Sequence, residues 1–583
     1  MYKVICLFWL LLLLSVTAGN GPNNPPDGAG SSKVTVLGDS EQSFLLRRWR
    51  GVTCDLCVWI TLELQDMIRK QTAVDVIVKE AIKICILFKI EDARVCSMIV
   101  PLFHEEILYV VDNLVLDPKE ACGIILGDSC GSPYYPGEMW NITLPNTPKP
   151  PPQPPTPPKP SSPTVRFLHL TDIHWDFDYR QGANPLCGEP LCCRASDNST
   201  AHTLSSSTAG RYGDFNQCDA PVDLLVSLFK HLSTIKDQFD YIIMTGDVPA
   251  HDVWNQTKTD QIAHVAALDK LFSQYLPDKP VYSCIGNHES TPVNSFPPPG
   301  ISGHNMDWLY GALANSWGKW LSQSAIDTIL SCGGYSFSPY PGFRIISINN
   351  NYCNNQNWWL LINATDPCNV LHWLVAELQK AEDKHEKVHM LMHIPPGDGG
   401  CLKAWSWNYY KIVNRYENTI VNQFYGHSHH DWFQMFYDET NFQRPVGFGF
   451  VAPSITPGSN INPIFRIYTM DGNYTGSSWA VLDYDSIYLN LTEANQSGYP
   501  TWKYSYSPKK LYNMTSLYAA DWNNLINRLQ SDDHMFQIFN LYRNNLYPSA
   551  PCEDQCKKDL LCEIISGRSN DPDLCKKHNY LAM

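Results

Sequence analysis

Short apolar runs that each end in a polar or glycine-containing motif recur along the middle of the chain. Five of them lie at residues 165–170, 241–244, 281–285, 388–392 and 423–425, and their β-branched and aromatic residues are typical of strands. Stretches with helical character lie between them at 221–236, 259–275 and 370–384. This alternation predicts an α/β domain in which helices flank the strands, and we place it at residues 164–495.

The region before this domain has a different pattern. Apolar residues recur there at helical spacing, for example Ile60, Leu64 and Met67, and Asp117-Pro118 has the form of a helix N-cap followed by proline at the first helical position. Six cysteines lie between Cys54 and Cys130. We therefore expect an all-α domain at residues 50–134 that is held together by disulfides.

A proline-rich segment at 140–163 separates the two domains. Proline fixes φ and removes an amide donor, so this segment is expected to be an extended polyproline II spacer. It would reach roughly 50–60 Å if straight. A ligand for an SH3-type domain is the alternative, but such partners are cytosolic. Helical pattern returns at 519–543, and we expect a C-terminal helical subdomain at 496–583.

The N-terminus has the form of a secretory signal. Lys3 precedes an apolar run from residue 4 to 14, and the small residues around Ala18 suit signal peptidase. The run is too short to span a bilayer comfortably, so residues 1–18 are predicted to be a cleaved signal peptide. Eight sequons fit glycosylation in the secretory pathway: Asn141, Asn198, Asn255, Asn363, Asn473, Asn490, Asn495 and Asn513.

The chain has 20 cysteines, of which Cys6 would leave with the signal peptide. In an oxidising compartment we expect disulfides rather than a zinc finger at Cys54-x-x-Cys57. The odd remainder leaves at least one thiol free or paired with another molecule.

Metal-binding residue types follow each of the five predicted strands. The motifs are Asp172-Ile-His174, Gly246-Asp247, Gly286-Asn287-His288-Glu289, His393 and Gly426-His427-Ser428-His429. Ligands form sites outside the carboxyl ends of strands in open α/β sheets, so these motifs can converge. Two metals about 3.5–4 Å apart can clamp a phosphate and activate water. The sequence therefore predicts a two-metal phosphoesterase.

Individual residues of these motifs carry further expectations. Asp247 is the natural bridging carboxylate, and ligands without thiolate suit zinc, with manganese or iron less favoured. His427 and His429 are two residues apart, so a turn at Gly426, where φ is unrestricted, would let both rings face the metals. Outside these motifs, His169, His389 and His430 are interpreted as structural.

These motifs resemble the calcineurin-like metallophosphoesterases and, within them, the acid sphingomyelinase family, through Gly246–Trp254, Gly286–Ser290, His393–Gly397 and Trp405–Tyr410. The resemblance implies that one metal is held by Asp172, His174, Asp247 and His429, and the other by Asp247, Asn287, His393 and His427. It assigns proton donation to the leaving alkoxide to His288 and a phosphate contact to His251. Glu289 is interpreted as a partner of a metal-bound histidine.

The resemblance also covers the flanking domains and implies a β-sandwich between helices, an N-terminal saposin domain and the C-terminal helical subdomain. A helical bundle without lipid function is the alternative for the N-terminal domain. The implied disulfides are Cys54–Cys130, Cys57–Cys122, Cys85–Cys96, Cys187–Cys192, Cys193–Cys218, Cys353–Cys401, Cys552–Cys556 and Cys562–Cys575. Cys284, Cys332 and Cys368 have no obvious partner.

The net charge of the chain indicates which binding partners to expect. The net charge of −15 with neutral histidines argues against nucleic acid and against anionic membranes at neutral pH. Protonating the 14 histidines not assigned to metal would bring the charge to about −1, so acid would permit approach to anionic lipid. We predict no stable protein partner.

The resemblance implies hydrolysis of sphingomyelin to ceramide and phosphocholine at two zinc ions, with the saposin domain presenting membrane lipid at acidic pH. The expected location is the lysosome lumen, the extracellular space or both. An acid phosphodiesterase of nucleotides or other phosphodiesters is one alternative, although such relatives typically lack the saposin domain. A lipid-binding or lipid-transfer protein is the other.

Overall fold

The computed structural model describes residues 54, 57–59, 61–87, 91–114, 117–126, 130, 139–153, 155–195 and 208–577. The predicted signal peptide and the sequon at Asn198 lie outside these residues. The chain divides into two compact units. The smaller comprises Met1–Met139 with Trp358–Ala364, and the larger comprises Trp140–Asn357 with Thr365–Met583.

The smaller unit is helical over its described residues. Its helices include α4 (Val74–Leu87), α5 (Ala93–Asp112) and α6 (Pro118–Leu126). Asp117 caps α6 as its sequence predicts, because its carboxylate accepts hydrogen bonds from the backbone N–H groups of Lys119 and Glu120 at 2.8 and 3.0 Å. Disulfides Cys54–Cys130, Cys57–Cys122 and Cys85–Cys96 join its segments. Five large apolar side chains of this unit stay exposed: Trp59, Leu62, Val74, Val76 and Ile86.

A short segment from the middle of the chain belongs to this helical unit. Residues Trp358–Leu361 form a 3-10 turn whose side chains are all buried. The rings of Trp358 and Trp359 lie 5.3 and 5.5 Å from those of Phe103 and Tyr109 on α5. Its tryptophans thus complete the core of a domain that precedes them by more than 200 residues in the sequence.

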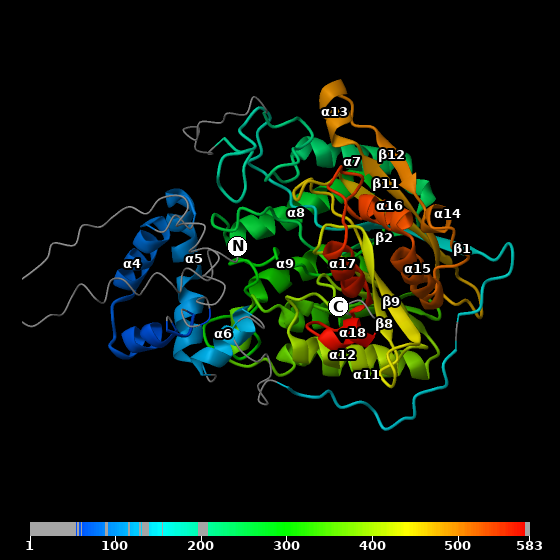
Figure 1. The fold of residues 1–583 in the computed structure, drawn as a ribbon, viewed down its shortest axis with the longest axis horizontal. Helices are drawn as coiled ribbons and strands as arrows, with labels where there is room; N and C mark the ends of the chain where they lie inside the picture. The colour runs from blue at the N-terminus through cyan, green and yellow to red at the C-terminus, as the bar shows by residue number, and fades with distance from the viewer. Residues whose placement is uncertain are drawn as a thin grey trace, which may run out of the picture. The chain divides into compact units, whose positions relative to one another are not determined.

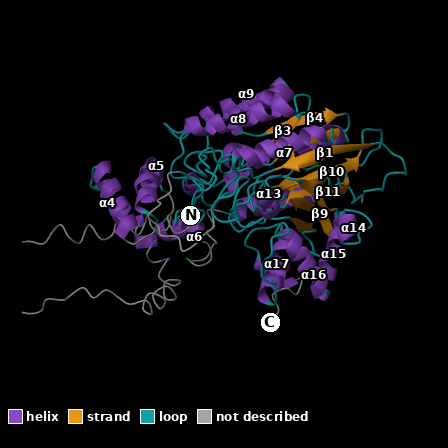
Figure 2. Cartoon of the chain, turned by 90° about the horizontal axis from the view of Figure 1, so that it is seen from above, coloured by secondary structure: helices purple, strands orange, loops and turns teal. Residues whose placement is uncertain are grey.

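The larger unit is built on two six-stranded sheets, drawn in Figures 1 and 2 with helices on both sides. The first has the order β12-β11-β10-β1-β2-β3, and the second β4-β5-β6-β7-β9-β8. The strands are β1 (Thr164–Leu170), β2 (Tyr241–Met244), β3 (Val281–Ser283), β4 (Tyr335–Tyr340), β5 (Phe343–Ser347), β6 (Lys387–Leu391), β7 (Ile420–Tyr425), β8 (Trp432–Tyr437), β9 (Pro445–Val451), β10 (Ile464–Asp471), β11 (Val481–Leu489) and β12 (Trp502–Tyr506).

The two sheets pack face to face through aromatic rings. Phe167 on β1 stacks on Tyr468 of β10 at 5.0 Å and meets Phe424 of β7, in the other sheet, edge-on at 5.4 Å. Strands β1, β2 and β3 run parallel, as do β5, β6, β7 and β9. The metal-site motifs all follow the carboxyl ends of parallel strands, namely β1, β2, β3, β6 and β7.

Helices cover both outer faces, as the amphipathic stretches predict. Buried leucines of α7 pack with Leu168 and Ile242 of the first sheet in one core cluster. The helices of this unit are α7 (Val222–Thr234), α8 (Lys258–Tyr275), α9 (Asp307–Trp317), α10 (Gln323–Cys332), α11 (Val370–Asp383), α12 (Lys403–Arg415), α13 (Leu491–Ser497), α14 (Pro508–Leu511), α15 (Ala519–Ser531), α16 (Asp533–Arg543), α17 (Gln555–Ile565) and α18 (Pro572–Lys577). Among the helices of the described residues, none has the length and apolarity needed to cross a bilayer.

The proline-rich segment, predicted as an extended spacer, is hydrogen-bonded to the larger unit. Ile142 donates its backbone N–H to Asn408 on α12 at 2.9 Å, and Asn408 donates to the carbonyl of Trp140 at 2.7 Å. Further along, Gln153 donates to Asn418 at 2.8 Å, and Asn418 donates to the carbonyl of Pro151 at 2.8 Å. Proline limits the backbone donors but leaves carbonyls, and these bonds hold the segment along the larger unit.

Candidate metal centre

The candidate ligands sit in the turns directly after their strands. Asp172 and His174 follow β1, Asp247 follows β2, and Asn287 follows β3. The other sheet supplies His393 after β6, with His427 and His429 after β7. All but His427 are buried. The face-to-face packing of two sheets therefore gathers seven side chains that span more than 250 residues of sequence.

The backbone is left-handed at five of these ligands. The φ angles of Asp172, His174, Asp247, His427 and His429 lie between 43° and 72°. A residue other than glycine adopts this backbone region at a cost of about 1–3 kcal/mol, and such residues cluster at functional sites. The turns therefore hold conformations that aim the ligands rather than those the backbone prefers.

The expectation of a turn at Gly426 with unusual φ is wrong in its detail. The left-handed conformation falls on His427 and His429 themselves, whereas Gly426 has no left-handed φ. A Cβ atom at Gly426 would instead overlap Thr171 Oγ1 and Asp172 Oδ2. Glycine is needed there because the β7 loop passes directly against the β1 loop.

One group of ligands gathers around His174. Its Nε2 lies 3.1 Å from Nε2 of His429 and 3.9 Å from Oδ1 of Asp172, and His429 Nε2 lies 3.6 Å from the same oxygen. Asp172, His174 and His429 can thus hold one cation.

The second group gathers around Asn287 and His393. The Oδ1 atom of Asn287 lies 2.9 Å from both His393 Nε2 and His427 Nδ1, and these two nitrogens are 3.2 Å apart. Asp247 joins the two groups, because its Oδ2 lies 3.1 Å from His393 Nε2 and 3.6 Å from His174 Nε2. The structure places Asp247 where a bridging carboxylate would be needed.

The donor set fits a pair of borderline cations. The Nδ1 atoms of His174 and His393 lie 2.9 and 2.6 Å from the carbonyls of Pro249 and Thr245, so Nδ1–H donation leaves Nε2 free toward the centre. Burial and the nearby Asp247 charge raise the pKa of Asp172 to about 7. Two cations would relieve this by ionising the buried carboxyl group.

Electrostatics within the ligand cluster is dominated by Asp247. Burial raises its pKa, but the imidazoles of His393 and His288 outweigh that effect and hold the pKa well below its usual range. Burial lowers the pKa of His393, yet Asp247 and Asp172 reverse this and raise it to about 9. The carboxylates thus favour a proton on His393, whereas burial lowers the pKa values of His174, His427 and His429.

His251 lies beside the cluster and is held by a carboxylate that the sequence did not reveal. Its ring stacks on that of His174 at 3.8 Å, and its Nδ1 lies 2.9 Å from Asp219 Oδ1. Asp219 also accepts hydrogen bonds from the backbone N–H of His251 at 2.7 Å and from Thr456 at 3.0 Å. Burial lowers the pKa of His251, but Asp219 outweighs it and the pKa is raised.

His288 lies edge-on to both rings, 4.8 Å from His174 and 4.6 Å from His251. Its backbone N–H donates to Asp247 Oδ1 at 2.8 Å, while its buried Nδ1 has no hydrogen-bond partner among the described residues. Burial lowers the pKa of His288 to about 3. The ring therefore presents a free nitrogen beside the ligand cluster.

Glu289 plays a different part from the one expected. Its carboxylate accepts hydrogen bonds from the backbone N–H groups of Gly286, Asp247 and Val248 at 2.5, 3.1 and 2.7 Å, and no metal-site histidine contacts it through a hydrogen bond among the described residues. It braces the β2 and β3 loops against each other, since neither loop can otherwise satisfy these buried donors.

Eighteen of the cysteines in the described part of the chain form nine disulfides. Besides the three in the helical unit, the structure joins Cys187–Cys192, Cys193–Cys218, Cys353–Cys401, Cys552–Cys556 and Cys562–Cys575. It also joins Cys332 to Cys368, for which the sequence offered no partner. Cys284 is a free, buried thiol.

The described sequons fall into two groups. Asn141, Asn255, Asn363, Asn473 and Asn513 are exposed, whereas Asn490 and Asn495 are half-buried. The side-chain amide of Asn495 accepts from the backbone N–H of Tyr212 at 2.9 Å and donates to the carbonyl of Gly213 at 3.0 Å. It serves as a brace for the 210–213 turn.

Comparison with known proteins places this centre in a family. Residues 165–431 match the model of calcineurin-like phosphoesterases, and residues 444–580 match the acid sphingomyelin phosphodiesterase C-terminal region. A sphingomyelin phosphodiesterase of Homo sapiens is 47% identical over 531 residues, which cover 91% of this chain and 83% of the relative. The chain belongs to the acid sphingomyelinase family. The expected family, fold class and enzyme class, a phosphodiester hydrolase, are thereby confirmed.

Other acid sphingomyelinase relatives differ in how much of the chain they share. A sphingomyelin phosphodiesterase of Bos taurus is 44% identical over 98% of this chain and 92% of its own length. An acid sphingomyelinase-like phosphodiesterase 3b of Mus musculus is 30% identical over only 68% of this chain and 87% of its own length. The matches to the human and bovine relatives therefore extend further along this chain than the match to the 3b protein.

Proposed function

We propose that this chain hydrolyses sphingomyelin to ceramide and phosphocholine with two zinc ions, and that it acts in the lysosome lumen or after secretion. The observation that carries the proposal is the extent of the likeness: relatives named sphingomyelin phosphodiesterase match over 91% and 98% of the chain, so the match includes both units. A nucleotide phosphodiesterase would need only the larger unit.

The proposed ligands follow the two groups. Asp172, His174 and His429 would hold one zinc ion, Asn287, His393 and His427 the other, and Asp247 both. When bound, the cations would supply positive charge to the phosphoryl oxygens and lower the pKa of water. Imidazole, carboxylate and carboxamide donors without thiolate favour zinc at such a site.

The remaining steps fall to the protein's own side chains. Asp219 holds His251 so that its imidazolium can bind a phosphate oxygen with a charge-assisted hydrogen bond. His288 would give a proton to the departing ceramide oxygen. Burial keeps its pKa low in the free protein, and the negative charge of the phosphodiester beside the ring would raise that pKa.

The helical unit would present the lipid. Its exposed apolar side chains are suited to contact with a lipid surface, because exposed apolar patches mark membrane or protein contacts. The scissile phosphate lies at the membrane surface, so a soluble active site must be brought to it. Acidic pH would reduce the protein's negative charge and permit approach to anionic lipid.

The metal assignment is tested by counting zinc in the purified, secreted protein. We expect about two zinc ions per chain, about one after His427→Ala, and almost none after Asp247→Ala, because Asp247 belongs to both groups. Turnover of bis-p-nitrophenyl phosphate should fall by at least about a thousandfold in Asp247→Ala. His534→Ala, an exposed histidine on α16, serves as the control. Full zinc content and activity in Asp247→Ala would contradict the assignment.

A further inference from the structure

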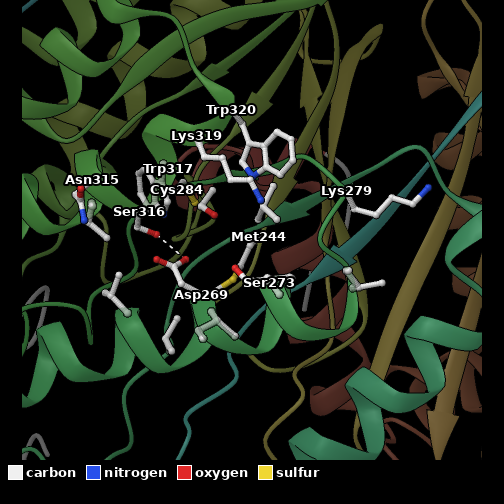
Figure 3. A pocket seen from close by; sticks show the side chains of 18 of the residues that line it. Met244, Asp269, Ser273, Lys279, Cys284, Asn315, Ser316, Trp317, Lys319 and Trp320 are labelled. Carbon is white, nitrogen blue, oxygen red and sulfur yellow. Dashed lines mark hydrogen bonds between the residues drawn. The ribbon is translucent and has the colours of Figure 1, made fainter.

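A cavity lies behind the β2 and β3 loops, and Val248 and Glu289, which neighbour the ligand Asp247, belong to its lining. It encloses about 220 Å³ between α8, α9 and the edge strand β3 of the first sheet, and none of the seven ligands lines it (Figure 3). Leu268, Phe272, Leu313 and Trp317 form a buried apolar wall. An apolar cavity of about 150 Å³ can hold benzene, so this one has room for a ring with a short side chain.

One carboxylate points in among the lining residues. Asp269 of α8 accepts a hydrogen bond from Ser316 at 2.7 Å, drawn as the dashed line in Figure 3. Within the part of the chain that the structure describes, no other side chain forms a hydrogen bond or ion pair with this carboxylate. Burial raises the pKa of Asp269, and the Ser316 hydrogen bond and the charge of Lys319 oppose that effect only in part.

The other charged groups of the cavity are already engaged. Lys319 donates to the carbonyl of Pro277 at 3.2 Å and lies 4.4 Å from the ring of Trp320. Lys279 donates to the carbonyl of Phe239 at 2.7 Å and extends away from the cavity in Figure 3. Glu289 uses its carboxylate on three backbone N–H groups. Asp269 is therefore the charged group of the lining with which a bound ligand can still form an ion pair.

We propose that this cavity binds a small apolar amine whose ammonium group pairs with Asp269 and whose ring or chain packs on the apolar wall. A carboxylate that is partly desolvated gains most from a ligand that brings its own positive charge. An anion would meet Asp269 unfavourably, and a neutral ligand of the same shape would lose the charge-assisted hydrogen bond. The site includes none of the seven candidate metal ligands and requires no phosphodiester substrate.

The chemical class is tested with 2-phenylethylamine and its neutral isostere 2-phenylethanol, titrated into the full-length secreted protein at pH 7 by ligand-observed NMR. The amine should bind at least about tenfold more tightly than the alcohol. Asp269→Asn should reduce amine binding to the level of the alcohol and leave the alcohol unaffected. Asp237→Asn, an exposed carboxylate distant in sequence, should change neither.

The location of the amine site is tested by placing a large side chain at an exposed residue of the cavity lining, which leaves the buried apolar wall unchanged. Ser273 lines the cavity and is exposed, so Ser273→Trp should abolish binding of both probes. Gln274→Trp is the control, because Gln274 is exposed beside it but does not line the cavity. Equal affinity for amine and alcohol, retained amine binding in Asp269→Asn or Ser273→Trp, or no binding of the amine at millimolar concentration would overturn the proposal.

Discussion

At the scale of single residues, two imidazoles beside the ligand cluster have opposite surroundings. His251 has a carboxylate partner in Asp219, and its pKa is raised, whereas His288 has a free buried Nδ1 and a pKa of about 3. The first is suited to hold positive charge against a phosphate. The second is neutral until substrate charge arrives, so it can change its protonation state during turnover.

Two substrates whose leaving groups differ in their need for a proton can show whether His288 is a proton donor or a structural residue. His288→Ala should lower sphingomyelin turnover by roughly 10²–10⁴-fold, since its alkoxide must be protonated. The same variant should retain bis-p-nitrophenyl phosphate hydrolysis to within about tenfold, because p-nitrophenolate leaves without a proton. Equal losses on both substrates, measured as kcat/KM, would argue against the donor role.

Asp219 should set the pH at which His251 loses its charge. The carboxylate raises the pKa of His251, so the protonated ring is present at low pH and is lost as pH rises through that pKa. Asp219→Asn lowers the pKa, and the alkaline limb of the kcat/KM profile should therefore move to lower pH. A limb that stays in place in Asp219→Asn, with only the amplitude reduced, would mean that His251 does not need its charge.

Asn495 should differ from the other sequons. Its amide braces Tyr212 and Gly213, and Gly210 lies so close that an added Cβ would overlap the Asn495 side chain. A glycan on this amide nitrogen would break the brace, so we expect mass spectrometry of tryptic glycopeptides to find Asn495 unmodified and Asn473 occupied. A glycan on Asn495 in the secreted, active protein would refute this.

That the seven candidate ligands lie close together could be predicted, because each follows an apolar strand in a recognisable motif. Asp219 could not, since it lies in no motif and acts on a residue 32 positions away through a contact that only the fold creates. Glu289 was recognised as polar and near the centre, but its partners are backbone N–H groups, which carry no sequence signal. Residue types therefore predict which side chains can bind a metal better than they predict which residues hold those side chains in place.

At the scale of elements, the proline-rich segment is tied to the larger unit by two asparagines. Asn408→Ala removes the acceptor for the Ile142 N–H, and hydrogen exchange of that amide should accelerate by roughly tenfold. Asn418→Ala should instead accelerate exchange at Gln153 and leave Ile142 protected. Unchanged exchange at Ile142 in Asn408→Ala would show that the segment is held by something else.

Periodicity located α7, α8 and α11 to within about two residues, because their apolar faces are packed on sheets, but α9, α10 and α12 were not predicted. It missed the break in the predicted helix at 519–543, where the Asp532 side chain accepts the N–H of Met535 and starts a new helix. It also gave no sign that Trp358–Leu361 belongs to the helical unit, since a four-residue turn has no period to detect.

At the scale of the whole molecule, burial limits how far acid can neutralise the chain. Burial lowers the pKa of His169 well below its usual range and the pKa values of His389 and His430 to about 3, so these three remain neutral at mildly acidic pH. The change from −15 to about −1 is therefore an upper bound on what the histidines contribute. Carboxylate protonation has to contribute as the pH falls further.

The role of the helical unit cannot be tested by deleting that unit, because a segment from the middle of the chain packs in its core. Deleting the helical unit would leave Trp358 and Trp359 without the core into which they pack. Point changes at its exposed apolar residues preserve that core. Leu62, Val74 and Val76 are 48%, 47% and 45% exposed, and the matched controls Val222 and Leu330 of the larger unit are 52% and 47% exposed.

We would measure phosphocholine release from sphingomyelin vesicles at about pH 5 by the full-length protein carrying Leu62→Ser, Val74→Ser and Val76→Ser together. The proposed function predicts a loss of at least about tenfold, because full burial of one such side chain is worth about 1.5–3 kcal/mol, and partial insertion of three together exceeds the roughly 1.4 kcal/mol that a tenfold change requires. Hydrolysis of bis-p-nitrophenyl phosphate, and sphingomyelin turnover in Val222→Ser with Leu330→Ser, should stay within about twofold of wild type. Wild-type sphingomyelin turnover in the triple variant, or no phosphocholine release by the wild-type protein while bis-p-nitrophenyl phosphate is cleaved, would contradict it.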